Sequence, residues 1–369
     1  MKASRFYSAF AISLILFGLL LACSKTATTT NNPPPVPLPP IPPVDTSSGP
    51  DIYTTGTVST YSDHFAAYWK NKQLFQLSDT ESYASCITVV DTNVYVAGWG
   101  GPGRLTCYWK NGVFNKIYHG YINETVTDIC SNGQDVYISG HGQSTFDHHV
   151  AEYWKNGQFV VMPLDFDNAA ANGIAVSGSD VYLVGYAYNH NNRSQAVLWK
   201  NGTPTTLTDG KHFAAATGIF IQGSDVYISG METDINDSFY VAKYWKNGQA
   251  VILSDSTSTC FTNCIFVDHN DVYVAGSQIA GTTLHPIGND RATYWKNGVE
   301  TKLFTGTEDS HTYMILTWDS DLYLTYNIYS NLPDSTTSPN YLKNQTPQFV
   351  DFGSFLRGDI IDIFIKSNH

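Results

Sequence analysis

The sequence predicts an all-β protein: a seven-bladed β-propeller with one-plus-three strand closure, preceded by a signal peptide and a proline-rich tether. Two phrases recur about every 40 to 50 residues, Asp-Val-Tyr-Ile/Val-Ser/Ala-Gly and, after it, Tyr-Trp-Lys-Asn-Gly. Short strand-like runs and turn signals fill each period, which is typical of four-stranded propeller blades. The recurring aromatic residues are Trp69, Trp109, Trp154, Trp199, Trp245 and Trp295, with Leu342 in the last copy, and Tyr53, Tyr95, Tyr137, Tyr182, Tyr227, Tyr273 and Tyr323.

Residues 1–22 have the pattern of a lipoprotein signal peptide. Lys2 and Arg5 give a positively charged start, and an apolar run leads to a small residue before Cys23. This ending resembles a bacterial lipobox, which implies cleavage before Cys23 and lipid attachment to its sulfur. By the same analogy Ser24 is compatible with the outer membrane, on its periplasmic or surface side. A retained transmembrane helix is the weaker alternative, because about a dozen apolar residues fall short of the roughly 20 needed to span a bilayer.

Residues 23–50 are predicted to form a linker. Ser, Thr and Asn are followed by the proline-rich run 33–43, which cannot build a core. Proline favours the polyproline II conformation, so the segment is expected to act as a semi-rigid spacer of about 3.1 Å per residue. A docking site for a proline-binding module is the alternative interpretation.

Four strands are predicted in each repeat, and the fifth repeat shows them best. The runs 217–221, 225–229, 242–245 and 250–253 are rich in β-branched and aromatic residues and are bounded by Gly, Ser and Asp. Asn-Gly between the last two runs favours a type I′ hairpin turn, in which both central residues need positive φ. We name these strands A to D, from the innermost to the outermost.

The order of the runs predicts how the ring closes. Residues 51–369 begin with a B strand at Asp51, and the final run 360–365 is an A strand with no B strand after it. Placed beside the first B strand, it completes blade one from both ends of the chain. Closure removes exposed sheet edges, whereas an open array, the alternative, leaves two. We therefore treat 51–369 as one domain.

Length varies mainly in the B–C loops, which leave a blade on the same side as the D–A connections. Variable loops on a rigid scaffold are where binding residues usually lie. Aromatic and polar side chains there fit a glycan or a protein of the cell envelope, although each of them singly also fits a solvated loop. The candidates are Tyr61, His64, Trp99, Arg104, Phe146, His149, Tyr188, Arg193, Tyr240, His285, Arg291 and Tyr329.

Acidic residues recur in the D–A connections. They are Asp79, Glu124, Asp165, Asp209, Asp255 and Glu308. Several together could form a calcium site or a pair of catalytic carboxylates, but Asp after a strand is also a common turn residue. The aspartates that open the B strands, such as Asp225, are interpreted as turn residues for the same reason.

Five cysteines remain besides Cys23, so they cannot all pair with one another. Cys260 and Cys264 lie at the end of a D–A connection, and in an oxidising compartment they could form a disulfide. Buried thiols are the equal alternative. Cys86 and Cys264 hold equivalent positions in their repeats, which favours a packing role for both.

Charge excludes one class of partner. The net charge is −12, and removing Lys2 and Arg5 with the signal peptide leaves −14. Seven lysines belong to the repeat phrase and are spread around the ring, so the sequence has no concentrated basic patch and nucleic-acid binding is not expected. The sequence shows no metal-binding His motif, no nucleophile elbow and no phosphate loop.

The phrase Ala196-Val197-Leu198-Trp199-Lys200-Asn201-Gly202, followed by Leu207, resembles the HAF-type repeats of bacterial secreted proteins. The resemblance covers nearly all of residues 51–350 and implies an extracellular propeller without catalytic residues to carry over. We expect a monomeric, lipid-anchored binding module with no obligatory cofactor. A propeller glycoside hydrolase or lyase that uses loop carboxylates is the alternative, and a purely structural envelope component is a third interpretation.

Overall fold

The chain divides into residues Met1–Gly49 and a compact unit, Pro50–His369. The computed structural model describes residues 49–145, 148–162, 168–279, 289–304, 308–329 and 340–367. The predicted signal peptide, Cys23 and nearly all of the tether lie outside these residues, as do the candidates Phe146, Asp165 and His285. In the described part of the chain, no helix is long and apolar enough to cross a membrane.

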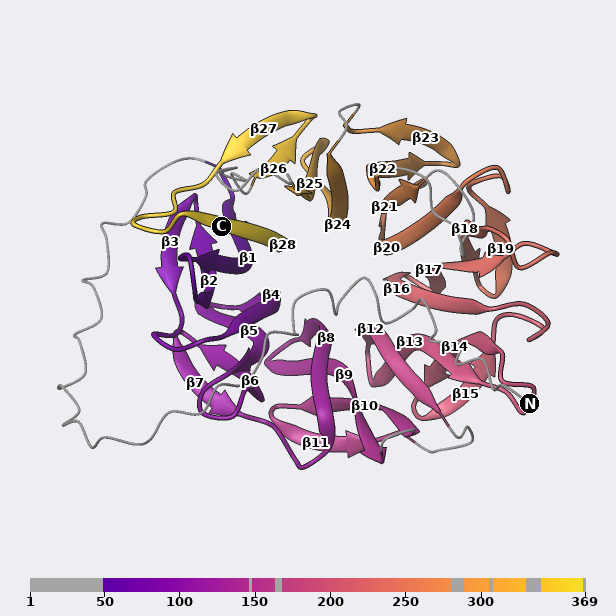
Figure 1. Cartoon of the computed structure of the whole chain (residues 1–369), viewed down its shortest axis with the longest axis horizontal. Coiled ribbons are helices and arrows are strands. Elements are labelled where there is room, and N and C mark those ends of the chain that lie inside the picture. The colour runs from indigo at the N-terminus through magenta and orange to yellow at the C-terminus, as the bar shows by residue number, and fades with distance from the viewer. Residues whose placement is uncertain are drawn as a thin grey trace. The chain divides into compact units, whose positions relative to one another are not determined.

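Seven four-stranded antiparallel sheets form a ring, which confirms the predicted seven-bladed propeller (Figure 1). Blade one consists of β28 (Arg357–Lys366), β1 (Asp51–Ser59), β2 (His64–Lys70) and β3 (Gln73–Gln76). Blade two has β4 (Tyr83–Val90), β5 (Asn93–Gly100), β6 (Leu105–Lys110) and β7 (Val113–Lys116), and blade three has β8 (Ile122–Asn132), β9 (Asp135–Thr145), β10 (His148–Lys155) and β11 (Gln158–Val161).

The other four blades have the same arrangement, with the first strand of each nearest the ring axis (Figure 1). Blade four has β12 (Ala169–Ser177), β13 (Asp180–Tyr188), β14 (Ser194–Lys200) and β15 (Thr203–Thr206), and blade five has β16 (Ala214–Gln222), β17 (Asp225–Thr233), β18 (Tyr240–Lys246) and β19 (Gln249–Ile252). Blade six has β20 (Thr259–Asp268), β21 (Asp271–Ile279), β22 (Arg291–Lys296) and β23 (Val299–Lys302), and blade seven has β24 (Asp309–Trp318), β25 (Asp321–Tyr329), β26 (Asn340–Lys343) and β27 (Thr346–Phe349).

The ring closes as predicted, through strands from the two ends of the chain. β1 pairs with β28 in antiparallel register, with Tyr53 opposite Phe364 and Thr54 opposite Ile363. The innermost strand of every blade carries a bulge near its middle, and in blade one the extra residue is Ile361 of β28, between the partners of Thr55 and Gly56. Residues at and beside the bulges face the next blade.

A chain of hydrogen bonds at these bulges links the inner strands of neighbouring blades. The bonds are Thr127 Oγ1 to the Ala171 carbonyl at 3.1 Å, Asn172 Nδ2 to the Ala216 carbonyl at 2.8 Å, Thr217 Oγ1 with Thr262 Oγ1 at 2.8 Å, and the Ile87 N–H to Asp362 Oδ2 at 2.8 Å. Because they run from blade to blade, they fix the inner wall of the ring in addition to the apolar packing.

The repeated phrases tie the outer strands of each blade together. In blade five, Asn247 Nδ2 donates to Asp225 Oδ1 at 2.8 Å, and Asn247 Oδ1 accepts from the Val226 N–H at 2.9 Å. Lys246 Nζ lies 2.8 Å from Asp225 Oδ2 and 5.0 Å from the centre of the Tyr227 ring. Asn247 has φ of 50°, as the predicted I′ turn requires. The B-strand aspartates are therefore structural, and they bind the hairpin turn of strands C and D.

The repeat tryptophans fill the space between blades, as predicted. All six are at most 1% exposed. Trp154 Nε1 donates to the Ile117 carbonyl of blade two at 3.1 Å, and Trp69 Nε1 donates to the Asp351 carbonyl that follows blade seven. These two indoles therefore anchor their blades to the ones before them, by apolar burial and by a directed hydrogen bond.

The disulfide between Cys260 and Cys264 is not formed, and both thiols are free. Both residues lie on the single strand β20, four positions apart. A regular strand rises about 3.3 Å per residue, which puts them roughly 13 Å apart. The Cα atoms of a disulfide lie within about 7 Å, so the pair cannot bridge. The packing role predicted from the equivalence of Cys86 and Cys264 holds, since Cys86 lies opposite Ala97 and Cys264 opposite Ala275.

We predict that Ile363→Ala lowers the free energy of unfolding by about 2–5 kcal/mol, the usual range for removing a buried Ile side chain. Ile363 is 1% exposed and packs in a cluster that joins β28 to blade seven, so the loss falls on the ring closure itself. Urea unfolding measures it. Ile252→Ala is the matched control, because Ile252 is 67% exposed and its loss is expected to stay within about 0.5 kcal/mol.

We also predict a pH dependence from Asp362, since burial raises its pKa to about 7, against the hydrogen bonds from the Ile87 and Ile363 amides. The unfolded value is about 3.9, so the folded protein binds more protons between these pH values. The free energy of unfolding of the wild-type protein, relative to that of Asp362→Asn, should therefore fall as the pH rises from 5 to 7, by at most about 1.4 kcal/mol per pH unit. Above pH 7 this difference should change little. Urea unfolding across this range tests it, and a flat difference would refute it. Asp255→Asn should not reproduce the trend, because hydrogen bonds from Thr257 lower the pKa of Asp255.

Candidate functional site

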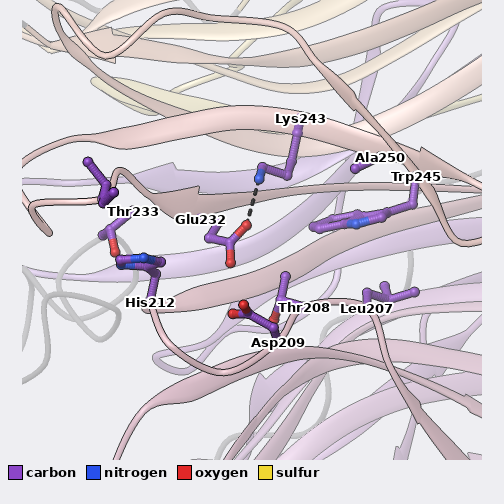
Figure 2. Close-up of a pocket in the computed structure, with 10 residues that line it drawn as sticks. Leu207, Thr208, Asp209, His212, Glu232, Thr233, Lys243, Trp245 and Ala250 are labelled. Carbon is purple, nitrogen blue, oxygen red and sulfur yellow. Dashed lines mark hydrogen bonds and ion pairs between the residues drawn. The ribbon is translucent and has the colours of Figure 1, made fainter.

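A cleft of about 460 Å³ opens between blades four and five. It lies on the side of the ring from which the B–C loops and the D–A connections emerge, which we call the loop face. Its lining consists of Leu207, Thr208, Asp209 and His212 from the connection after β15, Glu232 and Thr233 at the end of β17, Ile235 just after that strand, and Lys243, Trp245 and Ala250 from β18 and β19. Figure 2 labels all of these residues except Ile235. Its volume falls within the range of small-molecule sites.

An ion pair forms part of the cleft lining. Lys243 Nζ lies 2.6 Å from Glu232 Oε2, and the two side chains are 12% and 18% exposed. They extend toward each other from neighbouring strands, with Trp245 further along the same strand as Lys243 (Figure 2). The pair therefore presents charged hydrogen-bonding atoms beside an apolar wall without adding net charge.

Asp237 connects several side chains at the rim of the cleft through hydrogen bonds and ion pairs. Its carboxylate accepts from Thr233 and lies 3.1 Å from His212 Nδ1, and both of these partners line the cleft. Arg193 Nη1 donates to Asp237 Oδ2 at 2.8 Å, while its guanidinium lies 4.3 Å from the centre of the Phe213 ring. Burial raises the pKa of Asp237, but the hydrogen bonds from Thr233 and His212 and the charge of Arg193 outweigh it, so the net pKa is lowered and the rim carries a fixed carboxylate.

A second group of predicted residues meets between blades one and two. The ring of Tyr83 lies 5.2 Å from that of His64 and 4.6 Å from that of Trp99. Arg104 lies 5.3 Å from the Trp99 ring centre and donates to Glu81 at 2.6 Å. Burial lowers the pKa of His64, which favours the neutral ring. These side chains form a ladder of partly exposed rings on the loop face, and three of them are sequence candidates.

The remaining candidates are scattered. His149 contacts Gln143 at 3.0 Å, and Tyr329 shares a hydrogen bond of 2.7 Å with Tyr313. By exposure, Tyr61, Arg291, Asp79, Asp209 and Asp255 are exposed, Tyr188 and Glu308 are half-buried, and Tyr240 and Glu124 are buried. The five acidic candidates that the structure describes therefore do not converge on one calcium or catalytic site, although Asp209 lines the cleft and Glu124 lies beside His119.

Sequence reasoning missed Glu232 and Lys243. Lys243 lies opposite Gly230 in the sheet, and the residues in that position in other blades are Ala67, Cys107, Val197 and Thr293, with Glu152 in blade three. The repeats can be aligned by the glycine that ends the phrase Asp-Val-Tyr-Ile/Val-Ser/Ala-Gly. In that alignment, Lys243 and Glu152 stand out as charged residues at a position where the other blades have small ones. The loops alone carry no such signal.

No family model matches the sequence, and no curated protein matches it. Among solved structures, the fold is similar to a puromycin-hydrolysing peptidase of Mycobacterium tuberculosis, with a TM-score of 0.53 and 10% identity, covering 85% of this chain and 53% of that one. It is also similar to a prolyl endopeptidase, with a TM-score of 0.51 and 9% identity over 86% and 50% of the two chains. A TolB of Agrobacterium tumefaciens has a TM-score of 0.45 and 12% identity, with 70% and 89% covered.

The chain spans about half the length of the two peptidases. At identities near 10%, the similarity concerns the fold alone, and no activity of these proteins follows for this one.

Breaking the ion pair of the cleft should destabilise the protein. Lys243→Met leaves Glu232 largely buried without a cation, and we expect a loss of about 1–3 kcal/mol in the free energy of unfolding, between the values for exposed and buried pairs. Adding Glu232→Gln should recover part of it, because the unpaired charge is gone. Lys296→Met is the control: its pair with Asp271 is 46% and 41% exposed, so the loss should stay below about 1 kcal/mol. An equal loss in both single variants would contradict the assignment.

Proposed function

We propose that this protein is a lipid-anchored binding module of the cell envelope that takes a neutral, hydroxyl-rich ligand, a glycan, in the cleft between blades four and five. The observation that supports this proposal most directly is the chemical character of the residues that line the cleft. Thr208 and Thr233 supply hydroxyls, the Glu232–Lys243 pair supplies acceptors and donors, and Leu207 and Ile235 supply apolar surface. Sugars need both kinds of contact, because their C–H faces pack while their hydroxyl groups hydrogen-bond.

The charges around the cleft favour a neutral ligand. Glu232 is paired with Lys243, Asp237 with Arg193, and Asp209 with Lys211 at 2.7 Å. A strongly charged ligand would have to break one of these pairs, whereas a hydroxyl group can hydrogen-bond to the charged groups and leave each pair intact. Ile235, 84% exposed, adds an apolar edge to the rim.

The ring ladder of blades one and two supports the same class of ligand. Trp99, Tyr83 and His64 offer partly exposed ring faces beside the Arg104–Glu81 pair. Aromatic faces next to polar groups suit sugars and also suit the anchor residues of a protein partner. A protein of the envelope is therefore the second candidate ligand, with the ladder as its contact surface.

The anchoring part of the proposal rests on the sequence. The lipobox ending at Cys23 favours an outer-membrane lipoprotein, and the proline-rich run would lift the propeller away from the lipid. On this proposal the loop face meets its ligand at a distance from the membrane, in the periplasm or at the cell surface.

The glycoside hydrolase or lyase alternative is less well supported. Glu124 and Glu152 have pKa values raised by burial to about 7 and about 9, as a catalytic acid would. Their side chains are 0% exposed, however, and only the neighbouring His119, with a 21% exposed side chain, reaches solvent in this group of three. A glycosidic bond has to reach both carboxyl groups of such a pair, so this arrangement does not serve sugar cleavage.

Thermal unfolding of the purified protein against a panel of glycans tests the proposal. A ligand present at about 100 times its dissociation constant adds about 2.7 kcal/mol to stability. We expect a shift with one sugar class, and we expect Glu232→Gln, which keeps the shape of the side chain, to abolish it.

Two variants locate the ligand. Asp271→Asn, in the repeat ion pair with Lys296 of blade six, lies on the face opposite the loop face and should keep the shift. If Trp99→Ala abolishes the shift while Glu232→Gln keeps it, the ligand binds to the ring ladder and the cleft assignment is wrong. No shift with any sugar would favour the protein ligand instead.

A further inference from the structure

Three side chains that can bind a metal ion meet where the chain passes from blade two to blade three. His119 lies between β7 and β8, Glu124 lies near the start of β8, and Glu152 lies on β10. One donor atom from each falls within 4.8 Å of the others. His119 Nδ1 is 2.7 Å from Glu124 Oε2, and His119 Nε2 is 3.7 Å from Glu152 Oε2.

The two glutamates are buried with unsatisfied oxygens. Both side chains are 0% exposed, while His119 is 21% exposed. Glu124 Oε1 and both carboxylate oxygens of Glu152 have no hydrogen-bond partner among the described residues. A carboxylate in such a place has to be neutralised, either by a cation or by a proton.

A proton is the competing occupant. Burial, together with repulsion from Glu124, raises the pKa of Glu152 to about 9, and burial raises that of Glu124 to about 7. A metal ion that binds here therefore has to displace protons, and its affinity should increase with pH.

The repeats show that these residues are not part of the common blade design. In the sheet register, Glu152 takes the place of Ala67, Cys107, Val197 and Thr293, with Lys243 in blade five. Glu124 lies two residues before Val126, which is opposite Gly140, and counting in the same way along the other inner strands gives Ser82, Ala169, Ala214, Cys260 and Ser310. Small side chains suffice for packing at both positions. Two large acidic side chains together in one groove therefore need an explanation other than the blade core.

Aromatic rings hold His119 in place over the glutamates. Its imidazole stacks on Phe159 with ring centres 3.4 Å apart, and the edge of Tyr121 meets it at 4.4 Å. A fixed ring orientation favours metal binding, since little conformational freedom is lost on coordination. The exposed part of His119 gives an ion access from solvent.

We propose that His119, Glu124 and Glu152 bind a divalent first-row transition metal ion, with zinc as the best match. One imidazole nitrogen and two carboxylates form a donor set that zinc accepts at about 2.0–2.2 Å, with a fourth position left for water. Donors around such an ion lie roughly 3.4 Å apart, whereas these lie within 4.8 Å of one another, so the side chains have to close by up to about 1.4 Å. Calcium prefers about six to eight oxygen donors and should bind more weakly. The ion would clamp the connection between blades two and three onto β10.

Metal titration of the purified full chain, first stripped with a chelator, tests this site independently of the glycan cleft. Calorimetry with Zn²⁺, Mn²⁺ and Ca²⁺ should show one zinc per chain, and zinc should raise the unfolding temperature. Glu152→Gln and His119→Gln should each weaken zinc binding by at least about 100-fold, since even outer-shell partners contribute about 10–100-fold.

Two controls keep the result interpretable. Glu232→Gln changes a carboxylate in the other groove and His311→Gln removes a different His–Asp contact, at 3.4 Å, so both should bind zinc like the wild-type protein. Without metal, Glu152→Gln should be at least as stable as the stripped wild type, which shows that lost binding is not lost folding. The proposal is overturned if the wild type takes up no stoichiometric zinc, or if both site variants bind zinc as it does. A proton then neutralises the pair.

Discussion

Antiparallel pairing of β28 with β1 joins the two ends of the propeller in one sheet, and the closure of the ring depends on it. Each blade packs only against its two neighbours, so a missing inner strand in blade one would leave blades seven and two with an incomplete partner. Ile360 and Ile363 of β28 are buried in the cluster that reaches blade seven, and Asp362 accepts a hydrogen bond from blade two. The last strand thus contacts both neighbours of the first blade.

The blades are held together at two levels, and the part of each inter-blade groove on the loop-face side of the tryptophans is free to vary. Near the axis, bulge residues such as Asn172 bond to the next blade. Further out, the repeat tryptophans fill the grooves, and Trp154 bonds to a carbonyl of the preceding blade. On the loop-face side of the tryptophans, most blades have a small side chain at the third-strand position that Lys243 occupies in blade five. A change of residue there alters the groove without disturbing either level.

Two grooves use this freedom differently. Between blades four and five, Lys243 pairs with Glu232 and an open cleft remains. Between blades two and three, Glu152 occupies the position equivalent to Lys243, and its carboxylate faces Glu124 and His119 instead of a lysine. In the first groove, the ammonium group of Lys243 balances the charge of Glu232. The second groove has two carboxylates and no lysine at the equivalent position, so a bound metal ion could supply the missing positive charge.

The sequence by itself determined the blade number, the strand order, the closure and the buried tryptophans, because each of these is repeated or follows from counting repeats. Short-range chemistry carries such features: Asn-Gly dictates the hairpin turn, and alternation dictates the strand faces. It also indicated Arg193, Asp209 and Glu124 as polar residues of the loop face. Only the tertiary structure decided which side chains meet. Glu124 and Glu152 lie on strands that are not adjacent, and Cys260 and Cys264, close in sequence, are separated by an extended strand. Sites between blades depend on register and on the packing of neighbouring sheets, which no local pattern encodes.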